Sequence, residues 1–198
     1  MLDRAFGYHL LQMGATREHP LYESSPINHR IYAGEIGGGG INLVAQDDEL
    51  PLESDSVDAL IAHHSLDFAS HPHQVLREMQ RVVTPQGHLF IIGFNPYSLH
   101  GVGVLGRRAV RQPLWQRQKP VSQHRLTDWL NLLGCEVQAS QFVYSLPPIG
   151  RGRLRNWLVA GDNWSNKHNL PSGGVYILHA MKQMPGVSKT RRVGRLST

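Results

Sequence analysis

The sequence has a single cysteine, Cys135, among its 198 residues. One cysteine excludes an internal disulfide and is typical of a protein kept in a reducing compartment, so we expect the cytoplasm. No run of about 18 apolar residues occurs, and we therefore expect no membrane span. The opening residues, MLDRAFGYHLLQMG, contain too short an apolar stretch and no small-residue cleavage site, so they do not predict a signal peptide.

Acidic residues are missing from two stretches, residues 101–125 and residues 182–198, in which every charged residue is basic. The first stretch contains Arg107, Arg108, Arg111, Trp115, Arg117, Lys119 and Arg125, and the polar segment 147–174 includes Arg151, Arg153, Arg155, Trp157 and Trp164. Such segments either form a solvated face or contact an anionic partner such as RNA, with tryptophans stacking on bases. Both interpretations stay open.

The remaining composition is that of an ordinary globular protein, with 40% hydrophobic and 18% charged residues. A chain of this length forms one domain with a real core. We expect that domain to span residues 1–184, with basic inserts at about 97–121 and 147–174. Residues 185–198 are expected to form a disordered basic tail.

Residues 50–96 give the clearest local pattern. An apolar run at 57–62 predicts a buried strand, and a second run at 89–92 predicts another. Between them, Pro72 suits a first helical position and apolar residues recur at helical spacing as far as Val83. Ser70 or His71 would cap this helix, and the stretch 84–87 would end it. A strand, helix and strand of this length predict a right-handed βαβ unit in a parallel sheet.

Five further strands are predicted at residues 8–13, 28–34, 41–45, 136–144 and 175–181. A second helix is predicted between Ser122, a good N-cap, and Gly134, a good helix terminator. The chain is therefore expected to be an α/β protein with seven strands.

The central segment resembles class I S-adenosyl-L-methionine (SAM) dependent methyltransferases, especially the small type 11 methyltransferase-like group. The resemblance depends on an ordered set of residues: Leu50-Pro51, Ser56-Val57-Asp58, His63-His64, Leu76-Arg77-Glu78, Arg81-Val82, Pro85-x-Gly87 and Phe94-Asn95. It implies a Rossmann-like, mostly parallel seven-stranded sheet of order 3-2-1-4-5-7-6 flanked by helices, with the last strand antiparallel. It also implies SAM as cofactor.

The same resemblance assigns cofactor-binding roles by position. The residues concerned are Gln12, Gly14, Glu35, Gln46, Asp47 and His63. Family members have a glycine-rich loop after the first strand, and here only Gly14 matches, because Thr16 and Glu18 stand at the other glycine positions. We expect Gly14 to allow close approach of the cofactor, so that a larger side chain there would block binding and leave the fold intact.

His64 and Asp67 are the predicted catalytic residues. Methyl transfer from a sulfonium needs aligned reactants, and it needs a base only where the acceptor must lose a proton. His64 follows a strand at the sheet edge where open α/β folds bind ligands, and Asp67 is placed equally well. The structural alternative for the adjacent histidines is that one packs in the core and the other is solvated. We expect no metal site, because the histidines are scattered and no cysteine cluster accompanies them.

Two functions follow from these observations. The first is a SAM-dependent methyltransferase acting on an unidentified acceptor. The alternative is a non-catalytic methyltransferase-fold binding module that contacts RNA or a protein partner through its basic inserts. The reduced glycine loop favours the alternative, and the matching central segment favours the enzyme.

Overall fold

The computed structural model describes residues 2, 5–14, 20–36, 40–98, 119–143 and 174–184. The predicted tail and most of both predicted inserts lie outside these residues. No helix of the described chain is long and apolar enough to cross a membrane.

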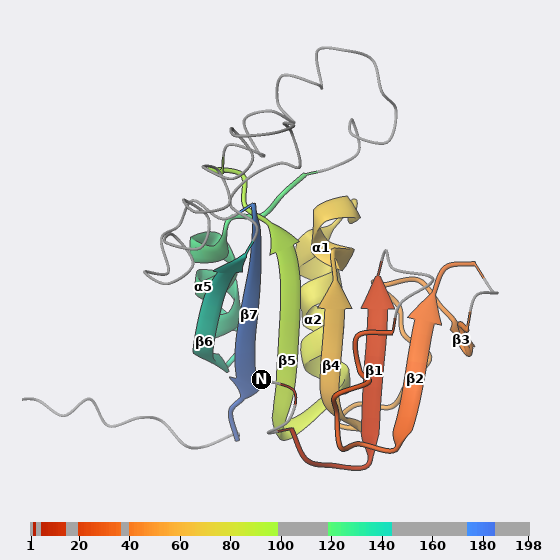
Figure 1. Cartoon of the computed structure of the whole chain (residues 1–198). Helices are drawn as coiled ribbons and strands as arrows, with labels where there is room; N and C mark the ends of the chain where they lie inside the picture. Colours follow the sequence, from red (N-terminus) through yellow and green to blue (C-terminus); the bar gives the residue numbers. More distant parts are fainter. Residues whose placement is uncertain are drawn as a thin grey trace, which may run out of the picture.

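The described chain forms one seven-stranded sheet of order β3-β2-β1-β4-β5-β7-β6, as predicted (Figure 1). The strands are β1 (His9–Gly14), β2 (His29–Gly34), β3 (Leu43–Val44), β4 (Val57–His63), β5 (Val83–Phe94), β6 (Cys135–Val143) and β7 (Val175–Lys182). Strands β1 to β5 pair in parallel, whereas β7 runs antiparallel to both β5 and β6. The first five strands therefore end at one edge of the sheet.

The helices within the described residues are α1 (Ser65–Phe68), α2 (Pro72–Val82) and α5 (Gln123–Leu132). Pro72 occupies the start of α2 as predicted, although the side chain of His71, its N-cap, makes no capping hydrogen bond. Ser122 caps α5 by accepting a hydrogen bond from the backbone nitrogen of Arg125, and Gly134 follows the helix at a φ of 74°. Both predicted helices thus form where their end signals stand.

Two layers of apolar side chains hold the sheet. On the helix-covered face, α2 and α5 pack on strand residues such as Leu11 and Leu60 (Figure 1). On the opposite face, Leu10 and Ile61 pack with Ile27 from the segment between β1 and β2. The alternation along β1 follows from the period of two in a strand, and it makes β1 and β4 the buried centre of the sheet.

The structure corrects three local predictions. Helix α1, a single turn directly after β4, was not predicted. Strand β3 has only two residues, whereas a strand was predicted at residues 41–45. The predicted break at 84–87 is part of β5, which starts at Val83. Val57 pairs with Val83 and Ala59 pairs with His88, so the four breaking residues bulge opposite one residue of β4.

Candidate functional site

A cavity of about 440 Å³ lies at the carboxyl ends of β1, β2 and β4. Its lining residues are Gly14, Gly34, Glu35, Ile36, Ile41, Gln46, Asp47, Asp48, His64, Ser65, Phe68, Ala69, Ser70, His71 and Val75. This volume lies within the usual range for small-molecule sites, and the location is the one that open parallel sheets use. The cavity contains five of the predicted site residues: Gly14, Glu35, Gln46, Asp47 and His64.

Gly14 ends β1 beside the end of β4. Its φ is +112°, and a Cβ added there would lie 2.1 Å from the carbonyl oxygen of His63 and 2.6 Å from the hydroxyl of Ser65. Glycine is thus required at this position by the close approach of two strands. The expectation that a larger residue would spare the fold is wrong, because the space beside Gly14 is filled by protein backbone.

Gln12 is fully buried in β1 and is not among the lining residues. Its side-chain oxygen accepts a hydrogen bond from the backbone nitrogen of Leu21 at 2.8 Å. Gln12 therefore ties the segment that follows the first loop back onto the strand. Thr16 and Glu18, at the replaced glycine positions, lie outside the described residues.

The acidic side of the cavity comes from the ends of β2 and β3. Glu35 directly follows β2 and is exposed, and Asp47 and Asp48 follow β3. Burial raises the pKa of Asp47 to about 6, against a lowering influence from the nearby Ser65 hydroxyl, and the carboxylates of Glu35 and Asp48 raise it further. All three acids line the same cavity.

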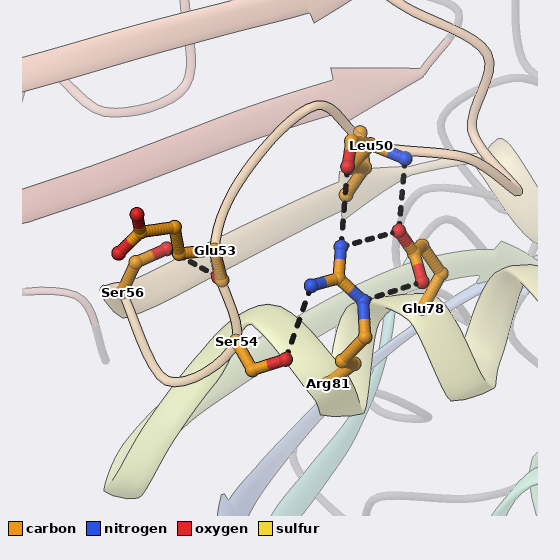
Figure 2. A network of polar contacts seen from close by, with 6 residues as sticks. All are labelled: Leu50, Glu53, Ser54, Ser56, Glu78 and Arg81. Carbon is orange, nitrogen blue, oxygen red and sulfur yellow. Dashed lines mark hydrogen bonds and ion pairs between the residues drawn. The ribbon is translucent and has the colours of Figure 1, made fainter.

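A polar clamp, formed by Glu78 and Arg81 of α2, holds the loop that carries Asp47 (Figure 2). Glu78 Oε1 accepts a hydrogen bond from the Leu50 backbone nitrogen at 2.9 Å, and Arg81 Nη2 donates to the Leu50 carbonyl at 3.1 Å. Arg81 also pairs with Glu78, at 2.6 and 2.9 Å, and donates to the Ser54 hydroxyl at 3.2 Å. The residue types that gave the central segment its resemblance thus fix the loop beside the cavity.

The two adjacent histidines have different surroundings. His63 is the last residue of β4, and burial together with His64 lowers its pKa to about 4, so it is neutral near pH 7. His64 follows in a left-handed backbone conformation, with φ at 58°, and lines the cavity. A non-glycine residue in this conformation is strained, and such strain is commonest at functional sites.

His64 and Asp67 form a buried pair. His64 Nδ1 lies 2.7 Å from Asp67 Oδ2, which also accepts a hydrogen bond from the backbone nitrogen of Phe94 at 3.0 Å. The imidazole stacks on the Phe94 ring, with centroids 3.9 Å apart. Burial raises the pKa of Asp67, while the hydrogen bond from His64 opposes that shift. Asp67 itself does not line the cavity, so it acts on the site through His64.

Most of the donors and acceptors that SAM binding needs are present in the cavity. Glu35 and Asp47 offer carboxylate oxygens for ribose hydroxyls or amino groups, and Gln46 offers an amide that both donates and accepts. Ile36 and Phe68, which are partly exposed, offer apolar surface for a purine ring. Arginine and lysine are absent from the described lining, which suits a cofactor with a net positive charge.

Several lining residues were not predicted, above all Ser65, Phe68 and His71. They belong to α1 and to the turn after it, and a four-residue helix leaves no periodic signal in a sequence. Among the described residues no group of three or more histidine, cysteine or acidic side chains is arranged to hold a metal ion.

Comparison with known proteins agrees with this geometry. Residues 28–91 match the family model of the Methyltransferase domain. The uncharacterized protein YafS of Escherichia coli K12 is 29% identical over 187 residues, covering 91% of this chain and 70% of that protein.

Solved structures extend the likeness to the whole fold. One is a possible histamine N-methyltransferase of Thermotoga maritima, with a TM-score of 0.64 and 16% identity over 88% of this chain and 82% of its own. Another is a SAM-dependent methyltransferase of Archaeoglobus fulgidus, with a TM-score of 0.60 and 18% identity over 88% of this chain and 86% of its own. At these identities the likeness shows the fold.

Proposed function

We propose that this chain, a class I methyltransferase by family match and by fold, transfers a methyl group from SAM to an acceptor whose nucleophilic atom carries a proton. The observation that carries the proposal is the buried pair of His64 and Asp67 at the edge of a cavity lined by Gly14, Glu35 and Asp47. A positioned base in a cofactor-sized cavity is what proton-coupled methyl transfer requires.

SAM, when bound, supplies an electrophilic methyl group on a sulfonium. Glu35, Gln46 and Asp47 are the residues that would hold it, with the backbone of Gly14 lining the cavity at the end of β1. His63 supports this end of the cavity through its backbone, since its carbonyl abuts Gly14. Gln12 contributes indirectly, by fixing the segment after the first loop.

The Asp67 carboxylate determines which ring nitrogen of His64 carries the hydrogen. A carboxylate beside Nδ1 favours the tautomer with hydrogen on Nδ1, which leaves Nε2 as the basic nitrogen. His64 would take a proton from the acceptor, and Asp67 would stabilise the resulting imidazolium. The stacked Phe94 ring keeps the imidazole in place during this step.

Calorimetry and thermal unfolding with SAM and S-adenosylhomocysteine test the cofactor. Ligand at a hundredfold excess over its dissociation constant should stabilise the fold by about 2.7 kcal/mol. Glu35→Gln keeps the side-chain shape and removes the charge, so it should weaken binding without lowering the melting temperature of the free protein. No thermal shift at millimolar ligand would refute the proposal.

Transfer itself is tested with SAM labelled on its methyl group and fractionated cell extract as the source of acceptor. Label should enter one acceptor fraction with the wild-type protein and fail to enter it with His64→Gln. The binding-module alternative depends on basic inserts that lie mostly outside the described residues, and the family match does not favour it.

A further inference from the structure

Ser65 is a buried polar residue that the function described above does not use. It is the first residue of α1, it lines the cavity, and only 5% of its surface is exposed. Its hydroxyl makes no hydrogen bond to any described residue. A buried hydroxyl without a partner costs about 1–3 kcal/mol, so such groups in folded proteins call for an explanation.

The position of Ser65 shows what the hydroxyl faces. It lies beside the end of β1, since a Cβ added to Gly14 would come within 2.6 Å of the Ser65 hydroxyl oxygen. On its other side it is near enough to Asp47 to favour the ionised carboxyl. Ser65 thus lies between the glycine at the end of β1 and the acidic side of the cavity.

We propose that Ser65 is a ligand-binding residue, whose hydroxyl acts with the Asp47 carboxylate to receive one hydrogen-bond donor of the bound cofactor. The inference rests on the proposed function, because it takes SAM as the ligand. Two parts of SAM offer such a donor, the ammonium of its amino-acid end and the hydroxyl or amino groups of its nucleoside. The chemistry is shared, and the experiment distinguishes the two.

Substituting a ligand-binding residue lowers ligand affinity without lowering the stability of the free protein, whereas substituting a structural residue lowers that stability. Ser65→Ala removes a hydroxyl that makes no hydrogen bond to the described protein, so at pH 5, where the folded Asp47 carboxyl is mostly neutral and gains nothing from this hydroxyl, the melting temperature of the free protein should stay the same or rise. The same substitution should weaken SAM binding about fivefold to tenfold, the value of one hydrogen bond. Ser56→Ala is the matched control, because its hydroxyl donates to the Glu53 carbonyl in the turn before β4.

The experiment measures the melting temperature without ligand and the dissociation constants of SAM and of 5′-methylthioadenosine, which lacks the amino-acid end. Weaker binding of SAM alone assigns the donor to the ammonium, and weaker binding of both assigns it to the nucleoside. A lower melting temperature of free Ser65→Ala at pH 5 would overturn the inference, as would unchanged dissociation constants. If the wild-type protein binds neither compound, the proposed function fails and the cofactor assignment of Ser65 fails with it. If the wild-type protein binds these compounds and Ser65→Ala binds them equally well, only the role of Ser65 is overturned and the proposed function stands.

Discussion

His64 Nδ1 lies 2.7 Å from Asp67 Oδ2, and the same carboxylate oxygen accepts the backbone N–H of Phe94 at 3.0 Å. The end of β5 therefore fixes the carboxylate that orients His64, the residue directly after β4. The Asp67 carbonyl also accepts the backbone N–H of Lys119 at 2.7 Å. Asp67 thus joins three segments around one imidazole, and this arrangement has consequences that can be measured.

Asp67→Asn should disturb the tautomer of His64. An amide at this position removes the negative charge that favours hydrogen on Nδ1, so the imidazole signals in ¹⁵N-resolved spectra should shift toward a tautomer mixture. Methyl transfer should fall by about 10²- to 10⁴-fold, the range for a positioned base, while SAM affinity changes little. Asp58→Asn is the control, because that carboxylate accepts backbone N–H groups of Tyr8 and His9 at the start of the sheet. Identical His64 spectra in Asp67→Asn would refute the assignment.

Arg81→Gln should weaken both the fold and the cavity. The substitution removes donors to Glu78, Ser54 and the Leu50 carbonyl, of which the pair with Glu78 is charge-assisted. Because the guanidinium is partly exposed, we expect a loss of about 1–2 kcal/mol in the free energy of unfolding.

The loop that Arg81 holds carries Asp47, so the affinity for SAM should fall as well. Arg77→Gln is the control on the same helix, because Arg77 is exposed, and it should alter stability by less than about 0.5 kcal/mol. Equal urea midpoints for the two variants would show that the clamp does not stabilise the loop.

The positions of most strands and helices were predictable from local patterns and the sheet order from the family resemblance, whereas the cavity was only partly predictable. The apolar runs and the helix end signals predict where strands and helices lie, because their periods are local properties of the chain. The partners of Gly14 and Ser65 are set by strand register and by the one-turn helix α1, which leave no local pattern. The same applies to Arg81, whose spacing from Glu78 is visible in the sequence but whose contact with Leu50 is a tertiary one.

Asp47→Asn should stabilise the protein above pH 6. Because the folded-state pKa of Asp47 is raised from 3.8 to about 6, the folded protein binds more protons than the unfolded chain between these values, and stability falls as pH rises through this window. The whole shift corresponds to about 3 kcal/mol, and screening of the partly exposed side chain reduces this to about 1–2 kcal/mol.

Urea unfolding at pH 7.5 and at pH 4 measures this effect. The free energy of unfolding of the variant should exceed that of the wild-type protein at pH 7.5. The difference should shrink at pH 4, where the Asp47 carboxyl of the folded wild-type protein is mostly neutral. SAM affinity should fall in the same variant, because the Asp47 carboxylate destabilises the free protein but contributes to binding the ligand. A difference in stability that is the same at both pH values would show that burial does not raise the pKa of Asp47.

Gly14→Ala should destabilise the fold rather than affect the cofactor alone. The added Cβ would lie 2.1 Å from the His63 carbonyl oxygen, so β1 and β4 must separate at the centre of the sheet, and the φ of +112° is itself unfavourable for alanine. Gly134→Ala separates these causes, because Gly134 also has a positive φ, +74°, and nothing lies within 4 Å of its added Cβ. We expect the free energy of unfolding to fall by about 1 kcal/mol in Gly134→Ala and by about 3 kcal/mol or more in Gly14→Ala, measured by urea unfolding without ligand. Equal losses would mean that only backbone strain acts at Gly14. A stable Gly14→Ala protein that has lost SAM binding would restore the view that this glycine serves the cofactor alone.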